Sequence, residues 1–313
     1  MKNVLVAGGA GFIGSWLCEE LLKQNFRVVC IDNLCTGREQ NILHLKQDKN
    51  FEFINCDIIK PLPESIGKMD FIFHLASPAS PPAYQKLAIE TLLVNSNGTL
   101  NLLELARKDN ARFLFASTSE VYGNPMQHPQ KETYWGNVNP NGIRSMYDES
   151  KRFAEALCMA YFRKYNIDLR IARIFNTYGP RMRADDGRVI SNFINQSLQD
   201  EPLTVYGDGK QTRSLCYVSD LVEGLLGLMF EEGIGGEVVN LGNPHERIIF
   251  ELAEIIRRLT NSKSEISFKE LPQDDPERRC PGISKAEKLL NWNPKISLEQ
   301  GLQKTIEWYK ANL

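Results

Sequence analysis

One short glycine-rich segment constrains the fold of this chain more than any other feature. Gly8, Gly11 and Gly14 follow directly on the apolar run VLVA and open a helical pattern of apolar residues. Glycines at this spacing allow a tight turn, a close approach of the backbone to a pyrophosphate and close packing of helix on strand. The free N–H groups and the dipole at the start of the helix also favour phosphate. The segment therefore predicts a dinucleotide site in a βαβ unit.

An acidic residue closes the next apolar run. Asp32 lies 18 residues after Gly14, where a carboxylate can accept hydrogen bonds from an adenosine ribose. The same carboxylate would repel a 2′-phosphate, so we expect NAD rather than NADP. Asp57 and Ser77 follow the third and fourth predicted strands, where each either faces the cofactor or caps a strand end.

Short β-branched and aromatic runs alternate with longer helical patterns up to about residue 180. This alternation is typical of a parallel sheet covered on both faces. We expect an α/β fold: a doubly wound, Rossmann-type NAD-binding domain over 1–180 and a smaller α/β lobe over 181–313, with a soft boundary that the chain crosses more than once. The expected strands are Asn3–Ala7, Arg27–Ile31, Phe51–Cys56, Phe71–Leu75, Phe113–Ser117, Leu169–Ile174, Leu203–Tyr206 and Val238–Leu241. The expected helices are Ile13–Lys23, Tyr84–Arg107, Tyr147–Lys164, Val189–Leu198, Leu221–Phe230, Phe250–Leu259, Lys285–Leu290 and Leu298–Lys310.

Charge and composition exclude several classes of protein. With 37 basic and 39 acidic residues the formal charge is −2, which offers no basic surface to a nucleic acid or to a membrane. The apolar stretch over 221–230 contains Glu223 and is far shorter than the ~20 residues that span a bilayer. The N-terminal residues lack a signal-peptide pattern, so we expect a cytoplasmic protein. Seven cysteines without a C-x-x-C pair and four scattered histidines indicate reduced thiols and no metal site.

A tyrosine and a lysine are placed for acid–base chemistry. Tyr147 and Lys151 stand at i and i+4, so they share one face of a helix. A nearby ammonium lowers the pKa of a tyrosine from about 10, giving a base that can take a hydroxyl proton as hydride leaves. Thr118, just beyond the run FLFAS, can hydrogen-bond the same oxygen. Alone, the pair would fit two surface residues; its position after a nucleotide motif favours catalysis.

Taken together, these motifs resemble the extended short-chain dehydrogenase/reductase superfamily, whose members mostly modify nucleotide sugars. Longer strings resemble those of the UDP-glucuronate decarboxylase (UDP-xylose synthase) family over essentially the whole chain. The strings are HLASPASPPAY (His74–Tyr84), ASTSEVYG (Ala116–Gly123), HPQKETYWGNVNP (His128–Pro140), YDESKR (Tyr147–Arg152), ARIFNTYGPRM (Ala172–Met182), DGRVISNFI (Asp186–Ile194), VYGDGKQTRSLCYVSDL (Val205–Leu221) and DDPERRCPGISKAEKLLNWNP (Asp274–Pro294).

The resemblance implies a decarboxylation in which NAD is regenerated. Oxidation at C4 of UDP-glucuronate places a ketone β to the carboxylate, so CO₂ can leave; the enol is protonated at C5 and hydride returns to C4, giving UDP-xylose. Tyr147 is then the base for the C4 hydroxyl. Lys151 lowers the pKa of Tyr147 and holds the nicotinamide ribose, and Thr118 orients the C4 oxygen.

Three further catalytic residues come from the resemblance alone. Ser119 and Glu120 resemble the family's residues beside the carboxylate and C5, and Arg279 matches the arginine of an R-x-P motif implicated in decarboxylation or reprotonation. Glu120 would otherwise be a surface carboxylate. Arg279 would otherwise contact a phosphate or form a salt bridge.

The binding residues form two sets. The expected cofactor-binding residues are Gly8, Gly11, Phe12, Ile13, Gly14, Asp32, Asn33, Thr36, Gly37, Asp57, Ile58, Leu75, Ser77, Tyr147, Lys151 and Thr177. The expected substrate-binding residues are Asn176, Arg188, Val189, Tyr206, Arg213 and Arg279. Arginine suits a diphosphate because its planar fork presents paired donors, although Arg188 and Arg213 would each also fit as solvated charges. We expect Trp135 in the core, the commoner place of a tryptophan.

Other functions use the same fold. A 4,6-dehydratase typically has an Asp-Glu pair after the threonine, where this chain has Ser119-Glu120. A 4-epimerase lacks the glutamate, and a non-catalytic NAD sensor has lost the tyrosine or the lysine, both of which this chain keeps.

The chain departs from the family pattern at Ser150, Leu215 and Gly282, none of them assigned to chemistry, so we expect effects on packing and on the seating of the sugar. A homodimer through paired helices is usual in the superfamily.

Overall fold

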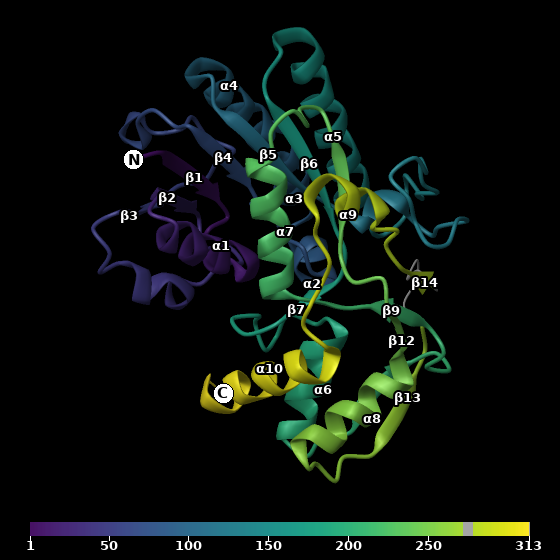
Figure 1. The fold of residues 1–313 in the computed structure, drawn as a ribbon. Coiled ribbons are helices and arrows are strands. Elements are labelled where there is room, and N and C mark those ends of the chain that lie inside the picture. The colour runs from purple at the N-terminus through teal and green to yellow at the C-terminus, as the bar shows by residue number, and fades with distance from the viewer. Residues whose placement is uncertain (272–277, 313) are drawn as a thin grey trace.

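The computed structural model describes residues 1–271 and 278–312. Its main element is a parallel sheet of seven strands in the order β11-β6-β5-β4-β1-β2-β3 (Figure 1). The doubly wound fold expected from the sequence is thereby confirmed. In sheet order the strands are β11 (Val238–Leu241), β6 (Leu169–Ile174), β5 (Arg112–Thr118), β4 (Phe71–His74), β1 (Asn3–Ala7), β2 (Arg27–Asp32) and β3 (Phe51–Asn55).

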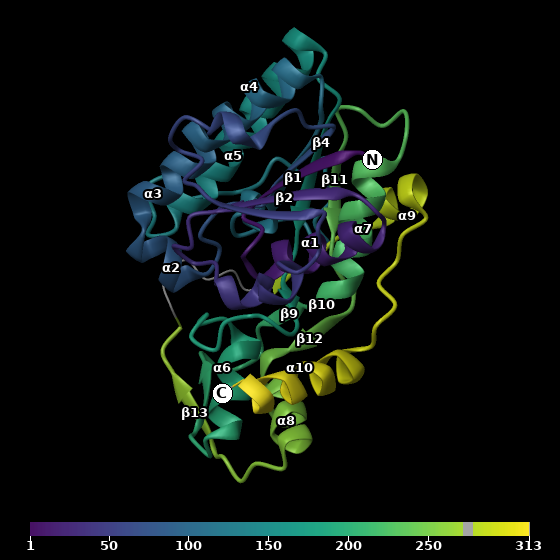
Figure 2. The ribbon, with the colours of Figure 1, turned by 90° about the vertical axis from the view of Figure 1, so that its left-hand side faces the viewer.

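Helices cover both faces of this sheet (Figure 2). On one face Val4 and Val6 of β1 pack in a core with Leu17 and Leu221, whereas Leu5 belongs to the core on the other face. Successive side chains of a strand point to opposite faces, so strands covered on both sides are apolar throughout. One layer holds α1 (Phe12–Lys23), α7 (Val218–Phe230) and α9 (Ser284–Leu290); the other holds α3 (Ala88–Leu93), α4 (Thr99–Asp109) and α5 (Ser145–Tyr165).

A second group of elements lies below the sheet in Figure 1. Its helices are α6 (Val189–Leu198), α8 (Ile249–Thr260) and α10 (Leu298–Asn312). Two small sheets of this group have two strands each: β8 (Leu203–Tyr206) pairs with β13 (Ile266–Lys269), and β7 (Thr177–Tyr178) pairs with β10 (Cys216–Tyr217). A third sheet has three strands, in the order β12 (Glu246–Ile248), β9 (Thr212–Ser214) and β14 (Arg278–Arg279). Short 3₁₀ helices cover Glu39–Leu45, Glu64–Ile66 and Ser119–Tyr122. These strands have two to four residues, too few for an alternating pattern to be recognised in the sequence. Of the strands in this group, the sequence predicts only Leu203–Tyr206.

The expectation of a single helix over Tyr84–Arg107 is wrong. The chain forms α2 (Pro81–Lys86), leaves helical geometry at Leu87, and continues through α3, a π-turn over Val94–Gly98 and α4. The π-turn and α4 place Val94, Leu102 and Leu103 in the core against the sheet, whereas Ile89 and Leu92 of α3 are exposed. At the π-turn the Asn95 amide donates to Ser77 Oγ at 3.0 Å and to Ser150 Oγ at 3.1 Å, bonds between segments that no local pattern predicts.

The core position expected for the Trp135 side chain is also wrong. Its side chain is 87% exposed rather than in the core. The main-chain carbonyl of Trp135 accepts a hydrogen bond from Arg152 at 2.7 Å, so the backbone is fixed while the indole faces outward. Within residues 1–271 and 278–312, no helix is long and apolar enough to cross a bilayer.

Candidate active site

A cleft of about 870 Å³ opens at the carboxyl ends of the central strands, between the sheet and the lower elements. The strand order reverses between β1 and β4, which is where doubly wound sheets bind their ligands. Most of the predicted residues line this cleft. They are Gly8, Gly11, Phe12, Ile13, Gly14, Thr36, Leu75, Ser77, Thr118, Ser119, Glu120, Tyr147, Lys151, Asn176, Thr177, Arg188, Val189, Tyr206, Arg213 and Arg279.

The glycine turn forms a cradle that larger residues would fill. Gly8 has φ +81°, and a Cβ there would lie 2.7 Å from the backbone nitrogen of Ala76. A Cβ on Gly14 would lie 2.1 Å from the carbonyl oxygen of Gly8. Both positions therefore require glycine. The helix that begins at Phe12 points its free N–H groups into the cleft, which fits the pyrophosphate of a dinucleotide.

Five of the expected cofactor residues do not line the cleft: Asp32, Asn33, Gly37, Asp57 and Ile58. The Asp32 carboxylate accepts hydrogen bonds from the Ala10 N–H at 3.1 Å and the Leu34 N–H at 2.8 Å, so it lies just behind the glycine turn. Burial raises the pKa of Asp32. Asp57 accepts a hydrogen bond from the Ile59 N–H at 3.0 Å, which is a local turn contact.

The tyrosine and lysine of α5 lie at the base of the cleft. Tyr147 is buried, and its pKa is raised to about 12 by burial despite the opposing hydrogen bond with Thr118. Lys151 donates to the carbonyl oxygen of Ala116 at 2.8 Å, and its Nζ lies 5.9 Å from the centre of the Tyr147 ring. Burial lowers the pKa of Lys151 to about 7. Thr118 is therefore the neighbour that most favours ionisation of Tyr147 in this arrangement.

Glu120 lies between two arginines. Arg279 Nη1 is 2.8 Å from Glu120 Oε1, and Arg144 Nη2 is 2.5 Å from Glu120 Oε2. Burial by itself would raise the pKa of Glu120, but the charges of Arg279 and Arg144 hold it at about 2. Glu120 is thus a largely buried, ionised group and not a surface carboxylate. Arg279 therefore forms a salt bridge with Glu120 and also donates to Ser119 Oγ at 2.9 Å.

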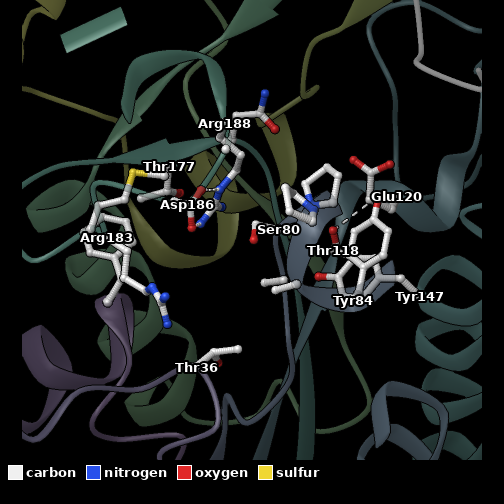
Figure 3. Close-up of a pocket in the computed structure, with 18 of the residues that line it drawn as sticks. Thr36, Ser80, Tyr84, Thr118, Glu120, Tyr147, Thr177, Arg183, Asp186 and Arg188 are labelled. Carbon is white, nitrogen blue, oxygen red and sulfur yellow. Dashed lines mark hydrogen bonds and ion pairs between the residues drawn. The ribbon is translucent and has the colours of Figure 1, made fainter. Parts of the chain in front are cut away.

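Two aromatic and basic neighbours of Tyr147 were missed by the sequence prediction. The ring of Tyr84, from α2, stacks on the Tyr147 ring (Figure 3). The guanidinium of Arg144 lies over the Tyr84 ring, 5.8 Å from its centre. Arg144 is the N-cap of α5, one helical turn before Tyr147, so its spacing was an available signal. In the sequence, Tyr84 ends a family string and begins an expected helix, and neither position indicates a contact with Tyr147.

A second cluster of charges lies on the opposite side of the cleft, across from Tyr147 (Figure 3). Arg188 caps α6 and donates to Asp186 through Nε at 2.5 Å and Nη2 at 2.9 Å. Burial alone would lower the pKa of Arg188, but Asp186 raises it. Arg183, also in the lining, pairs with Asp185 at 2.6 Å. This end of the cleft offers fixed guanidinium groups for a diphosphate.

One group of potential metal ligands occurs among the described residues, outside the cleft lining. The ligand atoms of His128, Glu246 and Cys280 lie within 4.8 Å of one another. Each already has a partner: His128 Nε2 lies 2.7 Å from Glu246 Oε2, Thr212 donates to Glu246 Oε1 at 2.5 Å, and the Cys280 thiol donates to a carbonyl at 3.2 Å. These hydrogen bonds account for the arrangement, and we assign no metal to it.

Comparisons with known proteins point to one family. Residues 4–242 match the model described as the NAD dependent epimerase/dehydratase family. UDP-glucuronic acid decarboxylase 1 of Xenopus tropicalis is 53% identical over 312 residues, covering 100% of this chain and 73% of that protein. UDP-glucuronic acid decarboxylase 3 of Arabidopsis thaliana is 50% identical over 312 residues, covering 99% and 90%. The structure of UDP-glucuronic acid 4-epimerase from Bacillus cereus, in complex with UDP-glucuronic acid and NAD, has a TM-score of 0.91 at 32% identity and covers 99% of this chain and 100% of that one.

Proposed function

Because the chain belongs to the NAD dependent epimerase/dehydratase family, we propose that it converts UDP-glucuronate into UDP-xylose and CO₂, with NAD as its cofactor. Relatives about half identical over almost the whole chain carry the name UDP-glucuronic acid decarboxylase. The structural observation that supports decarboxylation most directly is the ionised Glu120, held by Arg279 beside Tyr147 in one cleft.

The first step uses the residues at the base of the cleft. The glycine turn would hold NAD, which would supply a hydride acceptor for C4 of the sugar and the hydride that returns there. Tyr147 takes the proton of the C4 hydroxyl, and the hydroxyl of Thr118 bonds the same oxygen. Lys151 would hold the nicotinamide ribose of the bound cofactor. Burial of all three side chains keeps water from the reacting atoms.

The second step uses the arginine-bound carboxylate. Once C4 carries a ketone, the C4–C5–carboxylate unit is a β-keto acid, and the C5–carboxylate bond breaks with its electron pair moving into the enol. Glu120 is ionised, so its oxygens accept hydrogen bonds and can orient a solvent water that protonates C5, and Glu120 does not supply the proton itself. Arg279 fixes Glu120 and Ser119 together at this end of the sugar. The diphosphate then lies toward Arg188 and Arg213, with Asn176, Val189 and Tyr206 around the uridine.

Product analysis distinguishes this activity from its nearest alternatives. The purified protein is incubated with UDP-glucuronate and NAD, and the sugar is followed by NMR. UDP-xylose with release of CO₂ is the expected result. UDP-galacturonate would instead support a 4-epimerase, and an unchanged sugar from folded, NAD-loaded protein would exclude both. Water elimination from UDP-glucose, tested in parallel, would indicate a 4,6-dehydratase.

The chain also has a surface suited to self-association, and we propose a homodimer. Ile89 of α3, Leu100 of α4 and Phe153 of α5 are 63%, 39% and 53% exposed, on helices of one layer (Figure 2). Exposed apolar side chains grouped on neighbouring helices are typical of protein interfaces. Light scattering during size exclusion tests this: a dimer mass is expected, and Phe153→Asp should shift it toward the monomer.

Two coarser expectations complete the proposal. The NAD-binding part covers 1–180 and the nucleotide-sugar lobe 181–313, with α7 and β11 returning to the large sheet across that soft boundary. A cytoplasmic location stays a prediction that cell fractionation can test.

A further inference from the structure

The string HPQKETYWGNVNP contains a fully buried glutamine with no place in the chemistry above. Gln130 is 0% exposed and does not line the cleft. It lies beside the segment that carries Arg279 and pairs with Pro281 in an isolated bridge. A buried amide is costly unless its polar atoms are hydrogen-bonded, so the partners of Gln130 show which part of the structure it holds.

Gln130 binds the backbone on both sides of Pro281. Its side-chain Oε1 accepts from the Cys280 N–H at 2.9 Å, and its own N–H donates to the Cys280 carbonyl at 2.9 Å. Its carbonyl accepts from the Gly282 N–H at 2.8 Å. The side-chain Nε2 donates to the carbonyl of Gln127 at 2.8 Å, which fixes the orientation of the amide. Proline has no N–H of its own, so Gln130 supplies the hydrogen bonds that hold residues 280–282.

A second buried amide ties this arrangement to the large sheet. Asn240 of β11 donates to the Gln130 carbonyl at 3.0 Å and to the Gly282 carbonyl at 3.2 Å. Its Oδ1 accepts from the hydroxyl of Tyr122 at 2.8 Å. Because β11 belongs to the seven-stranded sheet, these hydrogen bonds anchor the segment after Arg279 to that sheet.

The side chain fixed by this anchor is that of Arg279. It is 2% exposed, and its guanidinium contacts Ser119, Glu120 and the carbonyl of Gly123, all more than 150 residues away in sequence. Cys280, the residue that Gln130 binds, is its immediate neighbour. A displacement of the Cys280 backbone would therefore carry the guanidinium away from Glu120.

We propose that Gln130 is a positioning residue for the decarboxylation step: by binding the Cys280 N–H, its side chain holds Arg279 on Glu120 and Ser119. The inference rests on the proposed function, in which Arg279 and Glu120 act after C4 oxidation. Among the residues that the structure describes, no hydrogen bond joins Tyr147, Lys151 or Thr118 to residues 278–283, so the oxidation step should not depend on Gln130.

The test replaces the amide with a side chain of similar length. Gln130→Met removes both side-chain hydrogen bonds, and Gln130→Glu keeps the acceptor for the Cys280 N–H if the methionine variant fails to fold. Gln196→Met is the matched control, because Gln196 also accepts from a backbone N–H, that of Thr204 at 3.0 Å, within α6 and β8. Single-turnover measurements follow reduced nicotinamide for C4 oxidation and CO₂ for decarboxylation.

We expect Gln130→Met to slow CO₂ release about tenfold or more while C4 oxidation changes less than about threefold, so that reduced nicotinamide accumulates. Gln130→Glu and Gln196→Met should keep the wild-type ratio of the two rates. In an Arg279→Ala background, Gln130→Met should add no further change to that ratio, because it acts through the arginine. Equal slowing of both steps, or independent effects in the double variant, would overturn the proposal.

Hydrogen exchange separates failure of this inference from failure of the proposed function. Amides of residues 278–283 should exchange faster in Gln130→Met than in the wild type, with unchanged exchange in β5. Unchanged exchange over 278–283 would overturn the positioning role even in an active enzyme. Faster exchange in a protein that does not decarboxylate UDP-glucuronate would uphold the contact between Gln130 and the Arg279 segment and refute the function.

Discussion

The ring of Tyr84 lies parallel to the ring of Tyr147, with centres 4.9 Å apart and planes within 8°. The two side chains come from α2 and α5, and together with Arg144 over the outer ring they form a continuous stack. The Tyr84 hydroxyl is buried and has no hydrogen-bond partner among the described residues. The orientation of the proposed base is therefore set by an aromatic neighbour that takes no proton itself.

This stack predicts different results for two substitutions of Tyr84. Tyr84→Phe keeps the ring and removes an unsatisfied buried hydroxyl, so the free energy of unfolding should rise by about 1 kcal/mol. Tyr84→Leu removes the stack, which is worth about 0.5–1.5 kcal/mol, and should also slow C4 oxidation about tenfold as the Tyr147 ring loses its support. Urea unfolding and single-turnover formation of reduced nicotinamide measure the two effects. Identical behaviour of both variants would argue against a role for stacking.

The geometry also predicts that the two chemical steps can be separated. Tyr147→Phe removes the base and should slow C4 oxidation by at least about a hundredfold. Glu120→Ala leaves Tyr147 and Thr118 in place, so some oxidation should persist while CO₂ release is strongly impaired. Reduced nicotinamide and released CO₂ are measured in one reaction. Equal loss of both signals in Glu120→Ala would show that Glu120 is not specific to the second step.

Lys151 gives a prediction on stability and pH. Its pKa falls from 10.5 in the unfolded chain to about 7 because the ammonium is buried. Between about pH 7 and pH 10 the unfolded chain therefore binds more protons than the folded protein, and stability rises with pH. Lys151→Met should remove this rise and, at pH 7, stabilise the protein by about 1–3 kcal/mol while abolishing turnover. Denaturant unfolding from pH 6 to pH 10 checks it; a variant with the wild-type slope would contradict it.

Asp148 predicts the opposite dependence. Burial, and then the charge of Glu120, raise the pKa of Asp148 from 3.8 to about 7, and its Oδ1 has no partner among the described residues. The folded protein binds more protons than the unfolded chain between about pH 4 and pH 7, so this group makes stability fall as pH rises through that window. Asp148→Asn should flatten the fall and be the more stable protein at pH 8, by about 1–3 kcal/mol. Unfolding curves at pH 5 and pH 8 test both statements, and a steeper fall in the variant would refute them.

Local patterns were enough for the framework of this protein. The apolar strands and the glycine turn are short-range features, because burial on both faces and a positive φ each dictate residue type directly. Tyr147 and Lys151 were found for the same reason: their spacing on one helix is fixed by the helix itself. The resemblance in longer strings supplied Glu120 and Arg279, but not their contact with each other.

The breaks in the helix expected over Tyr84–Arg107 and the exposure of Trp135 were decided by tertiary structure. Apolar residues recur through Leu87 and the π-turn, although Ile89 is exposed and Val94 lies in the core, so the break depends on contacts from Asn95 to distant chain segments. The exposure of Trp135 likewise follows from where the surrounding loop is anchored, by Arg152, and not from the nature of its side chain.

The sequence by itself determined the parallel sheet, the nucleotide turn and the residues able to carry a proton, because each depends on neighbours within a few positions. Only the tertiary structure placed Arg279 and Arg144 on either side of Glu120 and stacked Tyr84 on Tyr147. Those relationships join segments up to 159 residues apart. They decide which carboxylate stays ionised and how the base is oriented, because charge and burial act through space and not along the chain.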